Sequence, residues 1–224
     1  MTAKAEEKRR LPHRLAAYED ARLLSYRLVS YWKDIYLQSV PGKFPPTLND
    51  LFSQESINKM SLSLDLDGKP SVTPPRTWWA WLPQQTADMT TLAEKILERH
   101  VQALDPEAYS YIHSLLSDGM LAPTKANIMN TIKQSDQVTN FPRPRNLGSY
   151  LAEDEASLKP IVELQEWCRN EFKLLQGAGN SLIKEPFEMP PIKTPTSNPV
   201  SYMPPDKLQT QIVKQEEFRA RAKA

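Results

Sequence analysis

The longest stretch without a helix breaker runs from His13 to Val40, between prolines at Pro12 and Pro41. Within it, apolar side chains recur at alternating spacings of four and three residues, which makes one continuous stripe on an α-helix. We therefore predict one long helix from Pro12 to Val40 whose stripe faces a core. The stripe consists of Ala17, Ala21, Leu24, Leu28, Tyr31 and Ile35, widened by Val29, Trp32 and Tyr36.

Shorter helices are predicted where a capping residue precedes periodic apolar side chains. Proline at a first helical position and glycine just past the last one support the same boundaries. The predicted helices are a short one capped by Thr47, one over residues 56–60, one over residues 91–104, one from Asp105-Pro106 to Leu116, one capped by Thr124, and a last one from near Ser157 to Gly177.

A period-two pattern follows the second short helix. Leu62, Leu64 and Leu66 alternate with polar residues, which is typical of a strand buried on one face. Asp67-Gly68 comes next and is a common hairpin-turn pair. The sequence therefore predicts a small β-hairpin over residues 61–73. The other ligands of an EF-hand are absent here, so a calcium loop is not indicated.

Three tryptophans lie within four residues, at Trp78, Trp79 and Trp81. On a strand, Trp79 and Trp81 would share one face and Trp78 the other, and the cluster would join the hairpin to the helices. Rings of this size are also favoured anchors in partner interfaces and can stack on bases. Core packing and partner binding therefore both stay open for this cluster.

A proline-rich stretch, EPFEMPPIKTPTSNPVSYMPPDK, occupies residues 185–207 and contains no glycine. It lacks the P-x-x-P spacing of an SH3 ligand and the glycine of a flexible tether. Proline reduces the entropy lost when an extended segment is fixed on a surface. We therefore predict an arm that binds along a partner through the apolar side chains between its prolines, namely Phe187, Met189, Ile192, Val200, Tyr202 and Met203.

A basic helix is predicted after the arm, with Asp206 as its cap. Leu208 and Ile212 form a thin apolar stripe on it. Such a helix is marginal alone, so we expect it to become ordered against a partner protein or an acidic surface.

These elements predict a mainly α fold: an irregular helical bundle with a small β-hairpin, and an extended proline-rich C-terminal arm that ends in a short helix. The expected divisions are a basic tail (1–11), a helical domain (12–179) with the hairpin near residues 61–73, the arm (180–206) and the basic helix (207–224).

The net charge of +1 is unevenly distributed. Both ends are basic and the body is mildly acidic, which suits contact with nucleic acid or an acidic protein surface and is equally typical of solvated termini. The bases that could contact nucleic acid are Arg143 and Arg145, in a proline-stiffened loop beside Phe141, and Lys214, Arg219, Arg221 and Lys223 near the C-terminus.

No apolar run is long enough to span a membrane, and the N-terminus has neither a signal-peptide pattern nor the acid-poor composition of a transit peptide. A single cysteine, Cys168, excludes an internal disulfide. We therefore expect an intracellular, reducing compartment, most simply the cytoplasm, and no membrane partner.

Motifs for enzymatic chemistry are missing from the sequence. The three histidines, His13, His100 and His113, lack zinc-ligand spacing, and no nucleophile elbow or phosphate-binding loop is present. Cys168 lies on the apolar stripe of its helix and is expected to be a buried, unreactive thiol. No cofactor, metal or small-molecule substrate is predicted.

Three functions remain from the sequence. The first is a non-enzymatic subunit of a larger assembly that contacts other protein subunits through the arm and the C-terminal helix. The second is an accessory protein that binds RNA or DNA through the basic residues named above. The third is an enzyme with an unrecognised site, which would require His100 and His113 to converge with a carboxylate.

Overall fold

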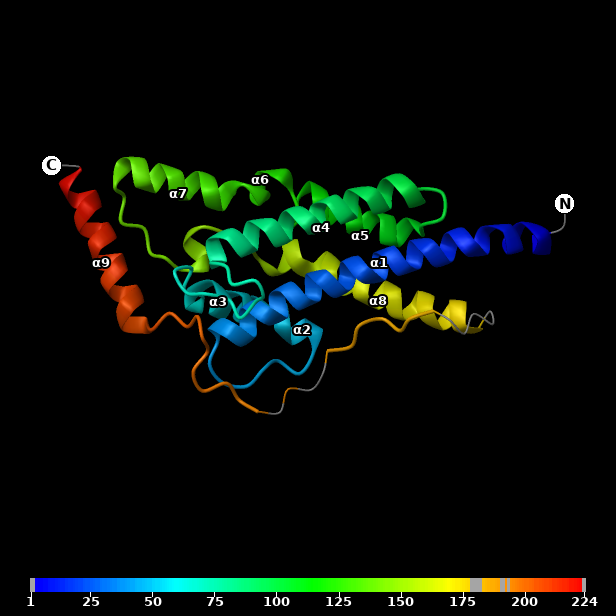
Figure 1. Ribbon diagram of the computed structural model, residues 1–224, viewed down its shortest axis with the longest axis horizontal. Helices are drawn as coiled ribbons and strands as arrows, with labels where there is room; N and C mark the ends of the chain where they lie inside the picture. Colours follow the sequence, from blue (N-terminus) through cyan, green and yellow to red (C-terminus); the bar gives the residue numbers. More distant parts are fainter. Residues whose placement is uncertain (1–2, 178–182, 190–191, 193, 223–224) are drawn as a thin grey trace.

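A computed structural model describes residues 3–177, 183–189, 192 and 194–222. Most of this chain is helical (Figure 1). The helices are α1 (Ala3–Ser39), α2 (Leu48–Leu51), α3 (Gln54–Ser63), α4 (Trp78–His100), α5 (Pro106–Ser117), α6 (Pro123–Ala126), α7 (Ile128–Thr139), the 3-10 turn η1 (Leu147–Ser149), α8 (Glu155–Gly177) and α9 (Pro205–Arg221).

Four long helices form the body. Helix α1 packs against α4 and α8, and α5 packs against the same two helices, which closes a ring of four around one core. Helices α6 and α7 lie against α4, and α9 lies across the end of the elongated body opposite the N-terminus (Figure 1). The predicted mainly helical class is confirmed.

Helix α1 carries the predicted stripe, and every residue of that stripe is buried. The helix begins at Ala3, however, and not at Pro12, which lies inside it. The residues before Pro12 are mostly alanine, glutamate, lysine and arginine, which are strong helix formers and extend the helix toward the N-terminus.

Several predicted helix starts are confirmed by their caps. Thr47 accepts a hydrogen bond from the Asp50 amide, and Asp105 accepts one from the Glu107 amide ahead of Pro106. Asp154 binds the Ser157 amide at the start of α8.

The expected caps Thr124 and Asp206 are wrong. Proline takes the first helical position in both places, at Pro123 and Pro205, so Thr124 and Asp206 lie inside the first turn.

The predicted β-hairpin is also wrong, because the described residues contain isolated bridges and no strand. Leu62 belongs to α3 and is 55% exposed, whereas Leu64 and Leu66 are fully buried. Bridge pairing in this segment involves only Leu64 and Asp65, and their partners are distant in sequence. The bridges join Leu64 to Tyr202 and Asp65 to Asn146. Asp67-Gly68 does form a tight turn, closed by a bond from the Gly68 amide to the Asp65 carbonyl.

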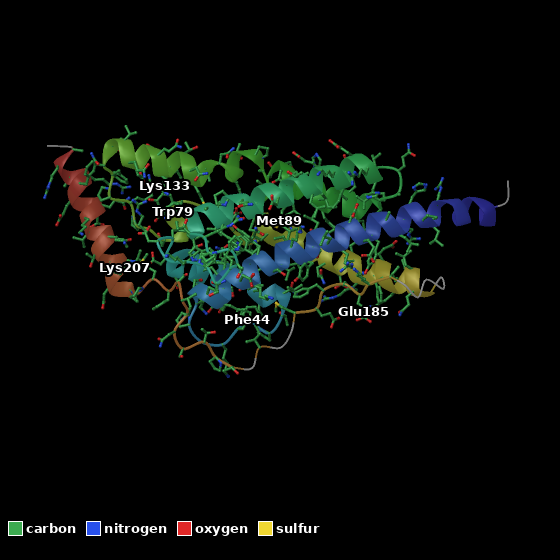
Figure 2. The ribbon with its side chains drawn as sticks, in the orientation of Figure 1. Phe44, Trp79, Met89, Lys133, Glu185 and Lys207 are labelled. Carbon is green, nitrogen blue, oxygen red and sulfur yellow. The ribbon has the colours of Figure 1, made fainter. Side chains whose placement is uncertain are left out.

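The tryptophan cluster opens helix α4 and does not form a strand. Residues three apart share a face of a helix, so Trp78 and Trp81 both enter the core. The predicted sharing of a face by Trp79 and Trp81 is therefore wrong, and Trp79, labelled in Figure 2, is half-buried with its ring edge-on to that of Tyr150.

Alanine substitutions at Leu64 and Leu62 distinguish the observed fold from the predicted hairpin, because the hairpin would bury both side chains on one face. We expect Leu64→Ala to lower the free energy of unfolding by about 2–5 kcal/mol, because it removes buried apolar contacts. We expect Leu62→Ala to change it by less than about 0.5 kcal/mol, because that side chain is mostly exposed. Urea unfolding of both variants measures the difference, and equal losses would support the hairpin.

Candidate functional site

The proline-rich arm lies along the chain's own body. It leaves the end of α8 and runs beside α1 toward α9 (Figure 1). Near its start, Tyr18 donates to the Lys184 carbonyl at 2.7 Å, and the Lys184 amide donates to Glu19 at 3.1 Å. Farther along, Gly42 pairs with Thr196 through two backbone hydrogen bonds. The described arm is therefore ordered against α1 and the loop that follows it.

The apolar side chains of the arm face in different directions. Phe187, Met189 and Ile192 pack against the core, with the Phe187 ring 5.0 Å from that of Tyr26. Tyr202 is half-buried, whereas Val200 is 64% exposed. Met203 is buried, so five of the six predicted partner-binding residues of the arm already have intramolecular contacts.

Ser201 anchors the end of the arm. Its amide donates to the Gln38 carbonyl, and its carbonyl accepts from the Asp65 amide. Its hydroxyl accepts from the Trp78 indole at 2.7 Å and donates to the Lys69 carbonyl at 3.3 Å. The fit is close, because a Cβ on Gly68 would lie 2.8 Å from the Ser201 hydroxyl oxygen.

A chain of alternating cations and aromatic rings lies where α4, α7, α9 and the loop of residues 141–150 meet, at one end of the body (Figures 1 and 2). We name it the cation–aromatic ladder. In order along it, its members are Lys133, Trp79, Arg145, Tyr150, Arg143, Phe141 and Arg219.

Each of the three rings of the ladder has two cations within 6.0 Å of its centre. At such distances the ring quadrupole attracts the cation. Lys133 lies 4.6 Å and Arg145 5.5 Å from Trp79, Arg145 lies 6.0 Å and Arg143 5.7 Å from Tyr150, and Arg143 lies 5.1 Å and Arg219 5.7 Å from Phe141.

A buried carboxylate supports the middle of the ladder. Asp136 accepts two hydrogen bonds from Arg143, at 2.9 and 3.1 Å, and one from the Tyr150 hydroxyl at 3.1 Å. Arg145 donates to the same hydroxyl at 3.2 Å. Burial is the largest cause that raises the pKa of Tyr150, to about 12. The charge of Arg145 lowers this pKa, and the hydrogen bond and charge of Asp136 raise it.

Helix α9 is attached to the body through the ladder. Phe218 packs edge-on against Phe141, with ring centres 5.5 Å apart, and Gln211 accepts from the Arg145 amide at 2.8 Å. Lys207 forms an ion pair with Asp65. The predicted stripe residues Leu208 and Ile212 are half-buried, and no described residue of α9 is fully buried.

The nucleic-acid candidates from the sequence are only partly brought together. Arg143, Arg145 and Arg219 join in the ladder, whereas Lys214 and Arg221 are exposed on α9 and Lys223 lies outside the described residues. Lys133 and Tyr150 were not predicted. Their positions give no local signal, because their partners come from other segments of the chain.

The groups considered for enzymatic chemistry have separate partners. His100 pairs with Asp20 at 2.8 Å, and the His113 ring stacks on Tyr109. Burial raises the pKa of the Cys168 thiol to about 12, which keeps it protonated. Within the described parts of the chain, no group of three or more histidine, cysteine or acidic residues is arranged to hold a metal ion.

The chain matches no protein-family model, no curated protein and no solved structure. None of the helices in the described ranges combines the length and the hydrophobicity needed to cross a bilayer.

Replacing the anchor of the arm should destabilise the body. We expect Ser201→Ala to lower the free energy of unfolding by about 1–3 kcal/mol, because the buried Trp78 indole loses its acceptor. Ser197→Ala is the matched control on the same arm, and its exposed side chain should contribute less than about 0.5 kcal/mol. Equal effects in thermal or urea unfolding would mean that the indole does not depend on Ser201.

Tyrosine 150 should give the ladder a characteristic pH dependence. We expect Tyr150→Phe to cost about 1–3 kcal/mol of unfolding free energy near neutral pH, because Asp136 and Arg145 lose a buried partner. Tyr26→Phe, at an exposed tyrosine, is the control.

The folded-state pKa of Tyr150 is above its ordinary value of 10.0, so the stabilisation from the neutral phenol is complete below pH 10. It is lost as the pH rises toward 12, and the gap between wild type and Tyr150→Phe should narrow over that range. A constant gap in urea titrations across this range would contradict the assignment.

Proposed function

We propose that this chain is a non-enzymatic subunit of a larger assembly, and that it contacts neighbouring subunits at the end of the body formed by α9 and the cation–aromatic ladder. The observation that carries the proposal is the position of α9. It is a helix of 17 residues with no buried residue among them, and it is held across the end of the body. A helix that buries so little of its surface in the core of its own chain is typical of a segment that packs on another chain.

The arm is a less favourable contact than the sequence suggested. Its side chains Phe187, Met189 and Ile192 pack against the core, and Ser201 makes four hydrogen bonds to the body. A partner would have to displace those contacts, whereas the outer face of α9 requires no displacement. The arm therefore acts in this proposal as the connection that fixes α9 at the end of the body.

The outer face of α9 is polar with one apolar position. Val213 is 42% exposed there, and Lys214, Glu216 and Glu217 within the next turn are exposed as well. Such a face suits the polar rim of a subunit interface with a small apolar centre. Leu208 and Ile212 lie on the same helix and are half-buried. They would add apolar area to the interface where a partner covers them.

Separate partners for His100 and His113 favour this proposal over an enzyme, because an acid–base site needs its groups to converge. A cleft of about 560 Å³ is lined by Lys125 and Glu153, which pair with each other at 2.8 Å. That pair connects α6 to the segment just before α8 through one oxygen of Glu153.

Photo-crosslinking from inside the native assembly tests the proposal. A photoreactive amino acid at Val213 should give discrete crosslinks to a protein partner in cells that express the chain naturally, because this position faces outward on α9. The same amino acid at Leu174, which is 62% exposed on α8, should give few. Crosslinks that are no stronger at Val213 than at Leu174 would contradict the proposal.

A shortened chain provides the structural control. Ending the chain after Pro204 removes α9 and keeps the Ser201 anchor, so the midpoint of thermal unfolding should change little. A large loss of stability would mean that α9 belongs to the folded core and is not a free contact element.

A further inference from the structure

The positive charge of the ladder is only partly neutralised within the chain. Arg143 is paired with Asp136, and Lys207, beside the ladder, is paired with Asp65. The structure gives no ion pair to Lys133, Arg145 or Arg219 among the residues it describes. The nearby carboxylate of Asp67 accepts a hydrogen bond from the Trp79 indole at 3.2 Å, and Lys133, Arg145 and Arg219 are the ladder cations that stay without an ion pair among the described residues.

We infer that the ladder binds the phosphate backbone of a single-stranded nucleic acid, with Lys133, Arg145 and Arg219 as the phosphate contacts. This inference goes beyond the proposed function, because it adds a nucleic-acid partner at the same end of the body. Arg143 is not a contact in this arrangement. Its guanidinium already makes two hydrogen bonds to Asp136 and holds the loop of residues 141–150 in position.

The three cations are preorganised for phosphate. Each is held at a ring and comes from a different element, namely Lys133 from α7, Arg145 from the loop and Arg219 from α9. A guanidinium presents several parallel donors that match phosphate oxygens, and holding it against a ring reduces the entropy lost on binding. The path from Lys133 to Arg219 therefore offers successive positive charges that a strand of phosphates can follow.

A partly exposed ring favours a single strand over a duplex or an acidic peptide. Phe218 is half-buried next to Arg219, and among the described residues no cation lies over its ring, whereas Trp79 and Phe141 each have two cations at their rings. An unpaired base can stack on such a ring, whereas a duplex keeps its bases stacked inside and an acidic peptide has no bases to stack.

The salt dependence follows from the number of contacts. Each phosphate neutralised on a single strand contributes about 0.7 to the slope of log affinity against log salt concentration. Three contacts predict a slope of about −2, which corresponds to roughly 20-fold weaker binding when NaCl is raised from about 50 to about 200 mM.

Fluorescence anisotropy with the full chain tests this inference. The probes are labelled oligo(dT) and oligo(rU) of about 20 nucleotides, which exceeds a typical single-strand site, and a duplex of equal length. Each of Lys133→Gln, Arg145→Gln and Arg219→Gln should reduce the slope by about 0.7, and the triple variant should leave almost no salt-dependent binding. Arg27→Gln, at an exposed arginine on α1, is the matched control and should leave the slope unchanged. Thermal unfolding of each variant checks that the fold is retained.

Three results would overturn the inference. They are no binding of either oligonucleotide near 50 mM NaCl, a triple variant that binds like wild type, and a duplex bound as tightly as the single strands. Competition by polyglutamate at equal charge would instead assign the ladder to an acidic protein and leave the proposed function standing. Protein crosslinks at Val213 are read independently of these probes, so the failure of either idea can be told from the failure of the other.

Discussion

Burial of the stripe on α1 is the constraint on which the rest of the molecule depends. Helix α1 contacts both α4 and α8, and its buried apolar face extends from Ala17 to Tyr36. Removing this apolar surface from water supplies the main driving force for assembling the bundle. The same helix then provides the polar groups at its sides that hold the arm, through Tyr18 and Glu19 near one end and the Gln38 carbonyl near the other.

The arm links that core to the outer end of the body. Ser201 makes backbone bonds to Gln38 and Asp65 and accepts from the buried Trp78 indole, so the arm completes hydrogen bonds that the core would otherwise lack. Leaving the buried Trp78 indole without an acceptor would cost free energy, so its bond to Ser201 helps to hold the arm at this position. The anchor also positions α9, because Pro204 and Pro205 follow Ser201 closely and restrict the backbone that enters the helix.

The ladder gathers residues that are charged and aromatic in turn. In isolation, neighbouring arginines would repel one another, but Asp136 neutralises Arg143 in the centre, and the rings lie between the remaining cations. This arrangement leaves the charge at the outer members, Lys133 and Arg219, and at Arg145. Arg143 and Arg145 also hold the ladder together, through Asp136 and the Tyr150 hydroxyl respectively.

The sequence alone determined the local features. It predicted the stripe of α1, the caps at Thr47 and Asp105, the burial of Cys168 and the helical class, because helix periodicity and capping depend on neighbours within a turn. It also indicated a basic loop at Arg143 and Arg145.

Only the tertiary structure decided which distant segments meet. The partners of residues 64–66 lie in the loop after α7 and in the arm, and Leu62 is helical and exposed, so the period-two pattern did not indicate a strand of a local hairpin. Trp79 meets Lys133 and Arg145 for the same reason, and Phe141 meets Arg219. Periodicity reports which face of an element is apolar, but the choice of its partner depends on packing the whole chain around α1, and no local pattern carries that information.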